Sequence, residues 1–96
     1  MNNAIVINCD DNVATVLTDL KKNDYIHYTD ELCDEIVIKC LENIPSFHKI
    51  AIKNILCGTP VIKYGEIIGV ANCLINTGQH VHINNVISAC KKNEGK

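Results

Sequence analysis

A spacing that occurs three times constrains the fold of this chain more than any other feature. Each copy holds an apolar residue, then asparagine or glycine three positions later, and another apolar residue three positions after that. Asparagine and glycine adopt positive φ at the least cost, so each copy predicts an apolar anchor, a chain reversal and the start of a strand. The copies are Leu20-x-x-Asn23-x-x-Ile26, Ile55-x-x-Gly58-x-x-Val61 and Ile75-x-x-Gly78-x-x-Val81.

The composition favours strands as the main element. The chain has 96 residues, of which only 4% are aromatic, and Ile and Val supply most of its larger apolar side chains. These β-branched residues pack well on a pleated surface. We therefore expect one all-β domain over residues 1–96, folded over itself by many turns, with residues 93–96 as a polar tail. Strands are expected over residues 4–9, 25–28, 36–41, 48–53, 61–63, 67–71 and 80–87.

One short helix is expected near the N-terminus, over residues 11–22. The polar run at residues 10–12 offers N-cap oxygens, which is a simpler use of it than binding a hard cation. Behind it, apolar residues recur at the three-and-four spacing of an amphipathic helix. Two lysines follow where cations suit the helix dipole. The apolar positions are Val13, Ala14, Val16, Leu17 and Leu20.

Charge and cysteine usage argue against several classes of protein. The net charge is −2 and every basic residue is lysine, so the basic surface of a nucleic-acid-binding protein is missing. No apolar run approaches the ~20 residues of a membrane span, and no export signal is recognisable. The six cysteines form no C-x-x-C pair. We expect them to be small buried hydrophobes in a reducing, cytoplasmic compartment.

Two histidines are candidate metal ligands. His80 and His82 are two positions apart, so on a strand their imidazoles share one face, with Cα atoms about 6.5–7 Å apart. One ion could be bound by both. The alternative is that they form the solvent side of a half-buried strand whose inner face is Val81 and Ile83. Taken alone, His48 fits a surface or capping histidine better than a ligand.

Two lysines lie near the glycine turns. Lys49 and Lys63 could meet an anionic substrate or the carboxylates of a partner, or they could be solvated surface charges. Glu66 is a lone carboxylate, so no acid–base pair of carboxylates is visible. The chain also lacks a phosphate-binding glycine motif and a nucleophile elbow. The residues therefore favour a subunit or a binding module over a self-contained enzyme.

Four segments of the sequence together resemble a known family. They are residues 11–15 (DNVAT), 48–51 (HKIA), 60–71 (PVIKYGEIIGVA) and 78–82 (GQHVH), the last accompanied by Asn85. Over about residues 8–87 the chain resembles the SAF domain of the altronate/galactarate dehydratase family, which implies a β-clip fold. In that family the domain is either the N-terminal part of a sugar-acid dehydratase or a separate small subunit, as in split altronate dehydratases and sulfolactate sulfo-lyase.

The resemblance also implies a reaction and a set of site residues. The family performs metal-dependent β-elimination on hydroxy acids, in which Fe²⁺ or Mn²⁺ polarises the carboxylate and the hydroxyl. His80 and His82 match the family's histidine motif and would line the site and bind the metal, which a large subunit would mainly hold. The other implied residues are His48 and Lys49 as catalytic groups and Lys63, Asn84 and Asn85 as substrate-binding groups.

The sequence departs from the family pattern at two positions. Asn84 stands where a third histidine is common, which argues against a metal site built from three histidines. Phe47 precedes His48 where glycine is usual, which makes the entry to that strand less flexible.

The leading interpretation is the small subunit of a hydroxy-acid lyase that acts on a sugar acid together with a larger catalytic subunit. On this interpretation the isolated chain has no lyase activity. Altronate, galactarate and sulfolactate remain open as substrates, and a homo-oligomer is compatible with the pattern. The alternative is a free-standing SAF module that recognises a carbohydrate acid or a partner protein without turnover.

Overall fold

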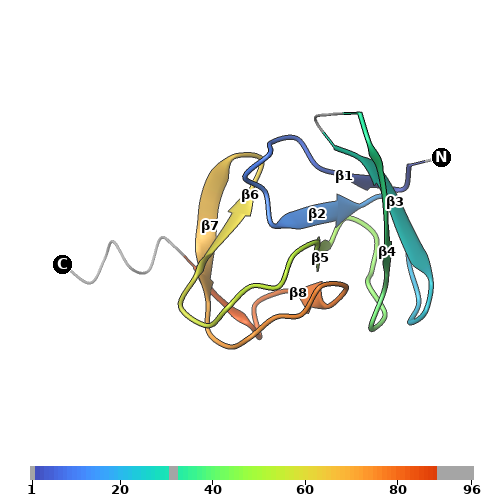
Figure 1. Cartoon of the computed structure of the whole chain (residues 1–96). Coiled ribbons are helices and arrows are strands. Elements are labelled where there is room, and N and C mark those ends of the chain that lie inside the picture. The colour runs from blue at the N-terminus through green and yellow to red at the C-terminus, as the bar shows by residue number, and fades with distance from the viewer. Residues whose placement is uncertain (1, 31–32, 89–96) are drawn as a thin grey trace.

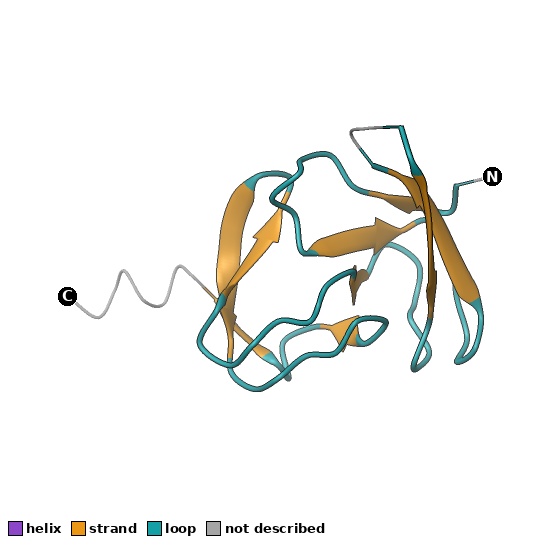
Figure 2. Ribbon diagram, viewed as in Figure 1, coloured by secondary structure: helices purple, strands orange, loops and turns teal. Residues whose placement is uncertain are grey.

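The computed structural model describes residues 2–30 and 33–88, and every regular element in these ranges is a strand (Figure 2). The expected all-β class is confirmed, whereas the expected tail at residues 93–96 lies outside the described residues. Within the described ranges, no helix is long and apolar enough to cross a bilayer. The strands are β1 (Ala4–Ile5), β2 (Val13–Val16), β3 (Tyr25–Thr29), β4 (Glu35–Lys39), β5 (Lys49–Ala51), β6 (Pro60–Lys63), β7 (Glu66–Ala71), β8 (His80–Val81) and β9 (Val86–Ser88).

The strands form three antiparallel sheets. The orders are β1-β2-β5-β8, β3-β4 and β6-β7-β9. The four-stranded sheet lies between the β3–β4 hairpin on one side and strands β6 and β7 on the other (Figure 1). Inside that sheet β5 pairs with both β2 and β8. Segments far apart in the sequence therefore meet at β5.

The core covers both faces of the four-stranded sheet. Ala14 of β2 and Ile50 of β5 belong to a cluster that includes residues of the β3–β4 hairpin. Val13 and Ala51, their neighbours in the same strands, belong to a second cluster with residues of β6, β7 and β8. Since successive side chains of a strand point to opposite faces, β2 and β5 carry one layer of the core on each side.

Four turn units, not three, build the rest of the core. The fourth is Ile44-x-x-Phe47-x-x-Ile50, which the sequence hides because phenylalanine occupies the turn position with a φ of 68°. The three predicted turn residues have positive φ as expected: 80° at Asn23, 87° at Gly58 and 94° at Gly78. A bulky residue in this region is strained by about 1–2 kcal/mol, and here the strain lies directly before His48.

The turn units are joined in pairs by one repeated hydrogen bond. Isolated antiparallel β-bridges join the apolar anchors in two pairs, Leu20 with Ile44 and Ile55 with Ile75. In every unit, the N–H of the turn residue donates a hydrogen bond to a backbone carbonyl of the paired unit, at 2.7–2.9 Å. The carbonyl belongs to the residue four positions before the apolar anchor of that paired unit. The domain is thus built from two copies of one paired arrangement. The four bonds run from Asn23 to Cys40, Phe47 to Val16, Gly58 to Ala71 and Gly78 to Ala51.

The helix expected over residues 11–22 is wrong, because Val13–Val16 form β2. All four side chains of β2 are buried, since the strand has a core cluster on each face. A strand covered on both faces shows no alternation of apolar and polar residues. Its apolar run therefore resembled the spacing of a helix, although three of its four residues are β-branched.

The polar cluster before β2 fastens loops instead of capping a helix. The Asp11 carboxylate is 1% exposed and accepts hydrogen bonds from the N–H groups of Ile7, Asn8 and Gly65, at 3.2, 3.1 and 2.7 Å. Asn12 makes two side-chain bonds to the backbone of β6, at 2.8 and 2.9 Å. These bonds hold the chain extended at the start of β2.

The strand expected over residues 80–87 is interrupted. Strands β8 and β9 are separated by a turn over residues 82–85, in which the N–H of Asn85 donates to the carbonyl of His82 at 3.0 Å. Asn84 lies exposed in this turn. It therefore does not continue the strand face of the two histidines, as an unbroken strand over residues 80–87 would require.

Only one of the cysteines in the described residues is buried in the core. Cys40 is buried, as expected, but the expectation is wrong for Cys9, Cys33, Cys57 and Cys73, which are exposed. Cys90 lies outside the described residues.

Candidate metal centre

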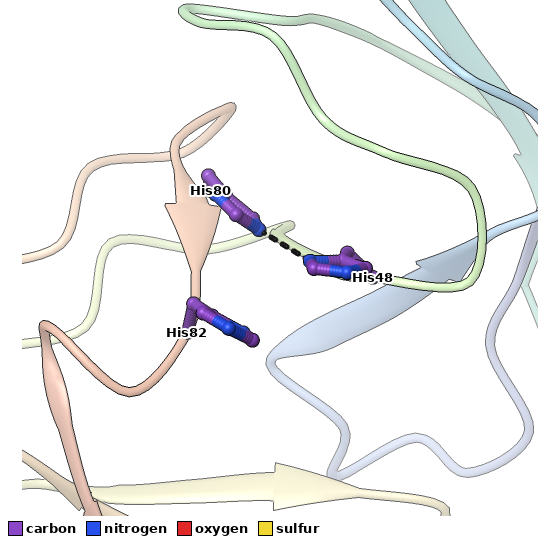
Figure 3. A group of neighbouring side chains, drawn as sticks. All are labelled: His48, His80 and His82. Atoms are coloured by element: carbon purple, nitrogen blue, oxygen red, sulfur yellow. Dashed lines mark hydrogen bonds between the residues drawn. The ribbon is translucent and has the colours of Figure 1, made fainter.

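The pairing of β5 with β8 brings three histidines together (Figure 3). His48 lies directly before β5, His80 begins β8, and His82 follows that strand. One ring nitrogen of each lies within 4.8 Å of the others, and His48 Nδ1 is 2.9 Å from His80 Nε2. The ring centroids are 4.8–5.3 Å apart. These side chains, which we call the histidine cluster, face a common point from two segments of the chain.

Two polar side chains fix the backbone beneath the histidine cluster. Asn85 is 3% exposed; its Oδ1 accepts from the N–H of His82, and its Nδ2 donates to the carbonyl of His80, both at 2.9 Å. Glu42 accepts from the N–H of His80 at 2.8 Å. The two histidines of β8 and its following turn are therefore held at a set spacing, although the strand itself has only two residues.

The electrostatic setting favours the neutral form of the His80 imidazole. Burial lowers the pKa of His80, and positive charge on His48 and His82 lowers that pKa further, while Glu42 acts in the opposite direction. A neutral imidazole keeps the lone pair that a metal ion requires. The cluster is half-buried, so a substrate can still approach it.

The cluster's geometry fits a metal ion. Two nitrogens bound at about 2.1 Å and at right angles lie ~3 Å from each other, which is close to the 2.9 Å between His48 Nδ1 and His80 Nε2. Imidazole suits iron, zinc, copper and nickel. Three ligands from one side would leave the other coordination positions of an octahedral ion for substrate or for groups from elsewhere.

The two candidate lysines lie beside the cluster. Lys49 and Lys63 line one cavity of about 350 Å³ together with His82. Burial lowers the pKa of Lys49, and the charge of Lys63 lowers it further. The structure thus brings both lysines and one histidine of the cluster to the same cavity.

The structure separates the remaining candidate residues. Asn84 is exposed in the turn after β8, whereas the amide of Asn85 is occupied by the backbone of the two histidines. Glu42 was not recognised in the sequence, because its contact with β8 comes from a segment 38 residues earlier. His48 gave no local signal either; only its place in the HKIA motif suggested a role in the site.

Comparison with known proteins identifies the family. The family model described as the altronate/galactarate dehydratase SAF domain matches residues 2–89, which include the whole histidine cluster. The chain belongs to this SAF-domain family. Two altronate dehydratases are similar to it: that of Bacillus subtilis (strain 168) is 33% identical over 85 residues, and that of Escherichia coli (strain K12) is 37% identical over 81 residues.

The SAF domain accounts for a small part of these relatives. The matches cover 88% and 84% of this chain but only 16% and 15% of the two altronate dehydratases. The chain thus spans about a sixth of the length of the curated relatives it matches. The predicted family is confirmed for the domain.

Replacing Asn85 with alanine is expected to weaken both the fold and the metal centre. The change leaves the carbonyl of His80 and the N–H of His82 without their partner, which costs about 1–3 kcal/mol. Loss of a group that orients metal ligands typically lowers metal affinity about 10- to 100-fold. Thermal unfolding and titration with Co²⁺ measure the two effects. Asn84→Ala, an exposed change in the same turn, is the control and should alter neither quantity.

Proposed function

We propose that this chain supplies the metal-binding face of a hydroxy-acid dehydratase whose other catalytic groups belong to a larger polypeptide. The observation that carries the proposal is the histidine cluster, which is half-buried and whose three imidazoles each bring a ring nitrogen within 4.8 Å of the others. The family membership of the domain supports a dehydratase as the assembly. The matched domain makes up only 16% and 15% of the two altronate dehydratases, so most of the length of these relatives lies outside it.

His48, His80 and His82 are the residues that would hold the ion. A bound Fe²⁺ or Mn²⁺ would polarise the carboxylate and hydroxyl of the hydroxy acid. The chain's own task is to keep the imidazoles oriented, through the backbone contacts that Glu42 and Asn85 make with His80 and His82. Removal of the proton beside the carboxylate then falls to a base of the larger polypeptide.

The isolated chain is expected to show no dehydration of altronate or galactarate, because it offers a metal centre without a complete acid–base set. Tagged chain purified from its native cell should bring with it a polypeptide related to the remainder of altronate dehydratase. That complex should dehydrate a sugar acid, lose activity on chelation and regain it with Fe²⁺ or Mn²⁺.

Two outcomes would contradict this proposal. Turnover of a sugar acid by the isolated chain would show that no larger polypeptide is needed. A complex that stays active after exhaustive chelation would remove the metal centre from the reaction. A chain that binds a sugar acid, has no dehydratase partner and shows no turnover would instead be the binding module considered above.

A further inference from the structure

The cavity beside the histidine cluster is lined by basic and aliphatic residues. The polar residues that line it are Lys49, Lys63 and His82, and no acidic residue lines it. Lys49 reaches it from β5 and Lys63 from the end of β6. The remaining wall is aliphatic and comes from Ile68, Ile83 and Val86.

The two lysines lack counter-charges. In the ranges that the structure describes, neither ammonium has a carboxylate within 4 Å. Glu66 faces Lys63 in the β6–β7 register, yet the two make no ion pair. Both lysines line the same cavity. Two unneutralised like charges at one cavity raise the free energy of the empty site, and an anion would relieve that repulsion.

We propose that the Lys49–Lys63 cavity binds the carboxylate of the hydroxy-acid substrate. The proposal rests on the proposed function and names the part of the substrate that this chain recognises. Both ammonium groups donate to the carboxylate oxygens in charge-assisted hydrogen bonds. The aliphatic wall disfavours a second charged or strongly hydrated group at this end of the molecule.

His82 connects the lysine cavity with the histidine cluster. It belongs to the histidine cluster and also lines the cavity. An acid whose carboxylate lies between the lysines therefore extends its adjacent hydroxyl toward the cluster. A neutral polyol of the same length lacks the group that the lysines recognise, so this cavity selects acids over the corresponding alcohols.

Acid binding by the full chain tests the proposal without turnover. Backbone amide NMR spectra are recorded during titration with galactarate, in the presence of a chelator, with the neutral polyol galactitol as the reference ligand. We expect galactarate, and not galactitol, to shift the amides of Lys49, Lys63 and His82. Lys49→Gln or Lys63→Gln should lower the affinity roughly 10- to 100-fold, and Lys63→Arg should restore part of the loss relative to Lys63→Gln. Lys53→Gln is the matched control, because it removes the same charge from an exposed position.

Three results would overturn the proposal: equal shifts with galactitol, shifts confined to other parts of the chain, or unchanged affinity in both glutamine variants. If Lys49→Gln unfolds, the affinities of Lys63→Gln and Lys63→Arg for galactarate still test the proposal. Co²⁺ titration of the same variants, after the chelator has been removed, separates this proposal from the metal centre. Retained Co²⁺ binding with no acid binding rejects the lysine cavity alone, whereas acid binding without Co²⁺ binding rejects the metal centre alone.

Discussion

A chain with alanine at both His80 and His82 is expected to lose metal binding, and with it the activity of the assembled dehydratase, while it keeps its fold. The double change leaves His48 as the single ligand of the histidine cluster, and one imidazole does not hold a divalent ion against water. We expect metal affinity to fall by more than about 100-fold, since even supporting contacts of a metal ligand account for 10- to 100-fold. The half-buried rings contribute little to the core, so the melting temperature should change by only a few degrees.

The measurements are Co²⁺ binding, thermal unfolding of the chain and dehydration by the complex. His27→Ala is the matched control, because His27 is a half-buried histidine on β3 outside the cluster. Retained metal affinity in the double variant would reject the cluster as a metal site. Unfolding of the double variant would give the imidazoles a structural role; in that case His82→Ala alone, which leaves the bond between His48 and His80, tests metal binding.

Replacing Gly78 with valine is expected to unfold most of the domain at physiological temperature. Gly78 has a φ of 94°, which a β-branched residue adopts at high cost. A Cβ here would also overlap the carbonyl oxygen of Lys39 and crowd Leu41, whose N–H donates to the Gly78 carbonyl. Strain of about 1–3 kcal/mol and overpacking of about 1–3 kcal/mol together approach the total stability of a small domain.

Gly58→Ala separates strain from overlap. Gly58 has a similar φ of 87°, but a Cβ at this position meets nothing within 4 Å. This variant should lose about 1–2 kcal/mol, which lowers the melting temperature by roughly 4–16 °C. Chemical denaturation measures both variants. Equal losses in Gly58→Ala and Gly78→Val would show that the contact with the end of β4 does not matter.

Local spacing predicted the turns but not all of them. Asn23, Gly58 and Gly78 are residues for which positive φ is cheap, so their role was visible in the sequence. Phe47 takes the same conformation against its own preference, because the anchor pair Leu20–Ile44 and the bond to Val16 determine the turn around it. A conformation imposed by tertiary contacts leaves no local signal.

The same distinction explains how much of the candidate metal centre could be predicted. The two-residue spacing of His80 and His82 indicated a shared site, because that spacing is a property of the strand itself. His48 joins them only through the pairing of β5 with β8, which no local pattern encodes. Asn84 would share the face of the two histidines in an unbroken strand over residues 80–87, but it lies in a turn because the strand ends after Val81.

The pairing of β5 with β2 and β8 also determines when the histidine cluster can form during synthesis. The hairpins β3–β4 and β6–β7 join neighbouring segments, so they can close quickly as the chain grows. Strand β5 needs β2 from far upstream and β8 from far downstream, and closing such loops is the slow step. Because His80 follows His48 by 32 residues, a ribosome-bound chain carries His48 without its companions while that stretch is synthesised. The proposed metal affinity of the domain therefore arises in one late event, when β8 pairs with β5.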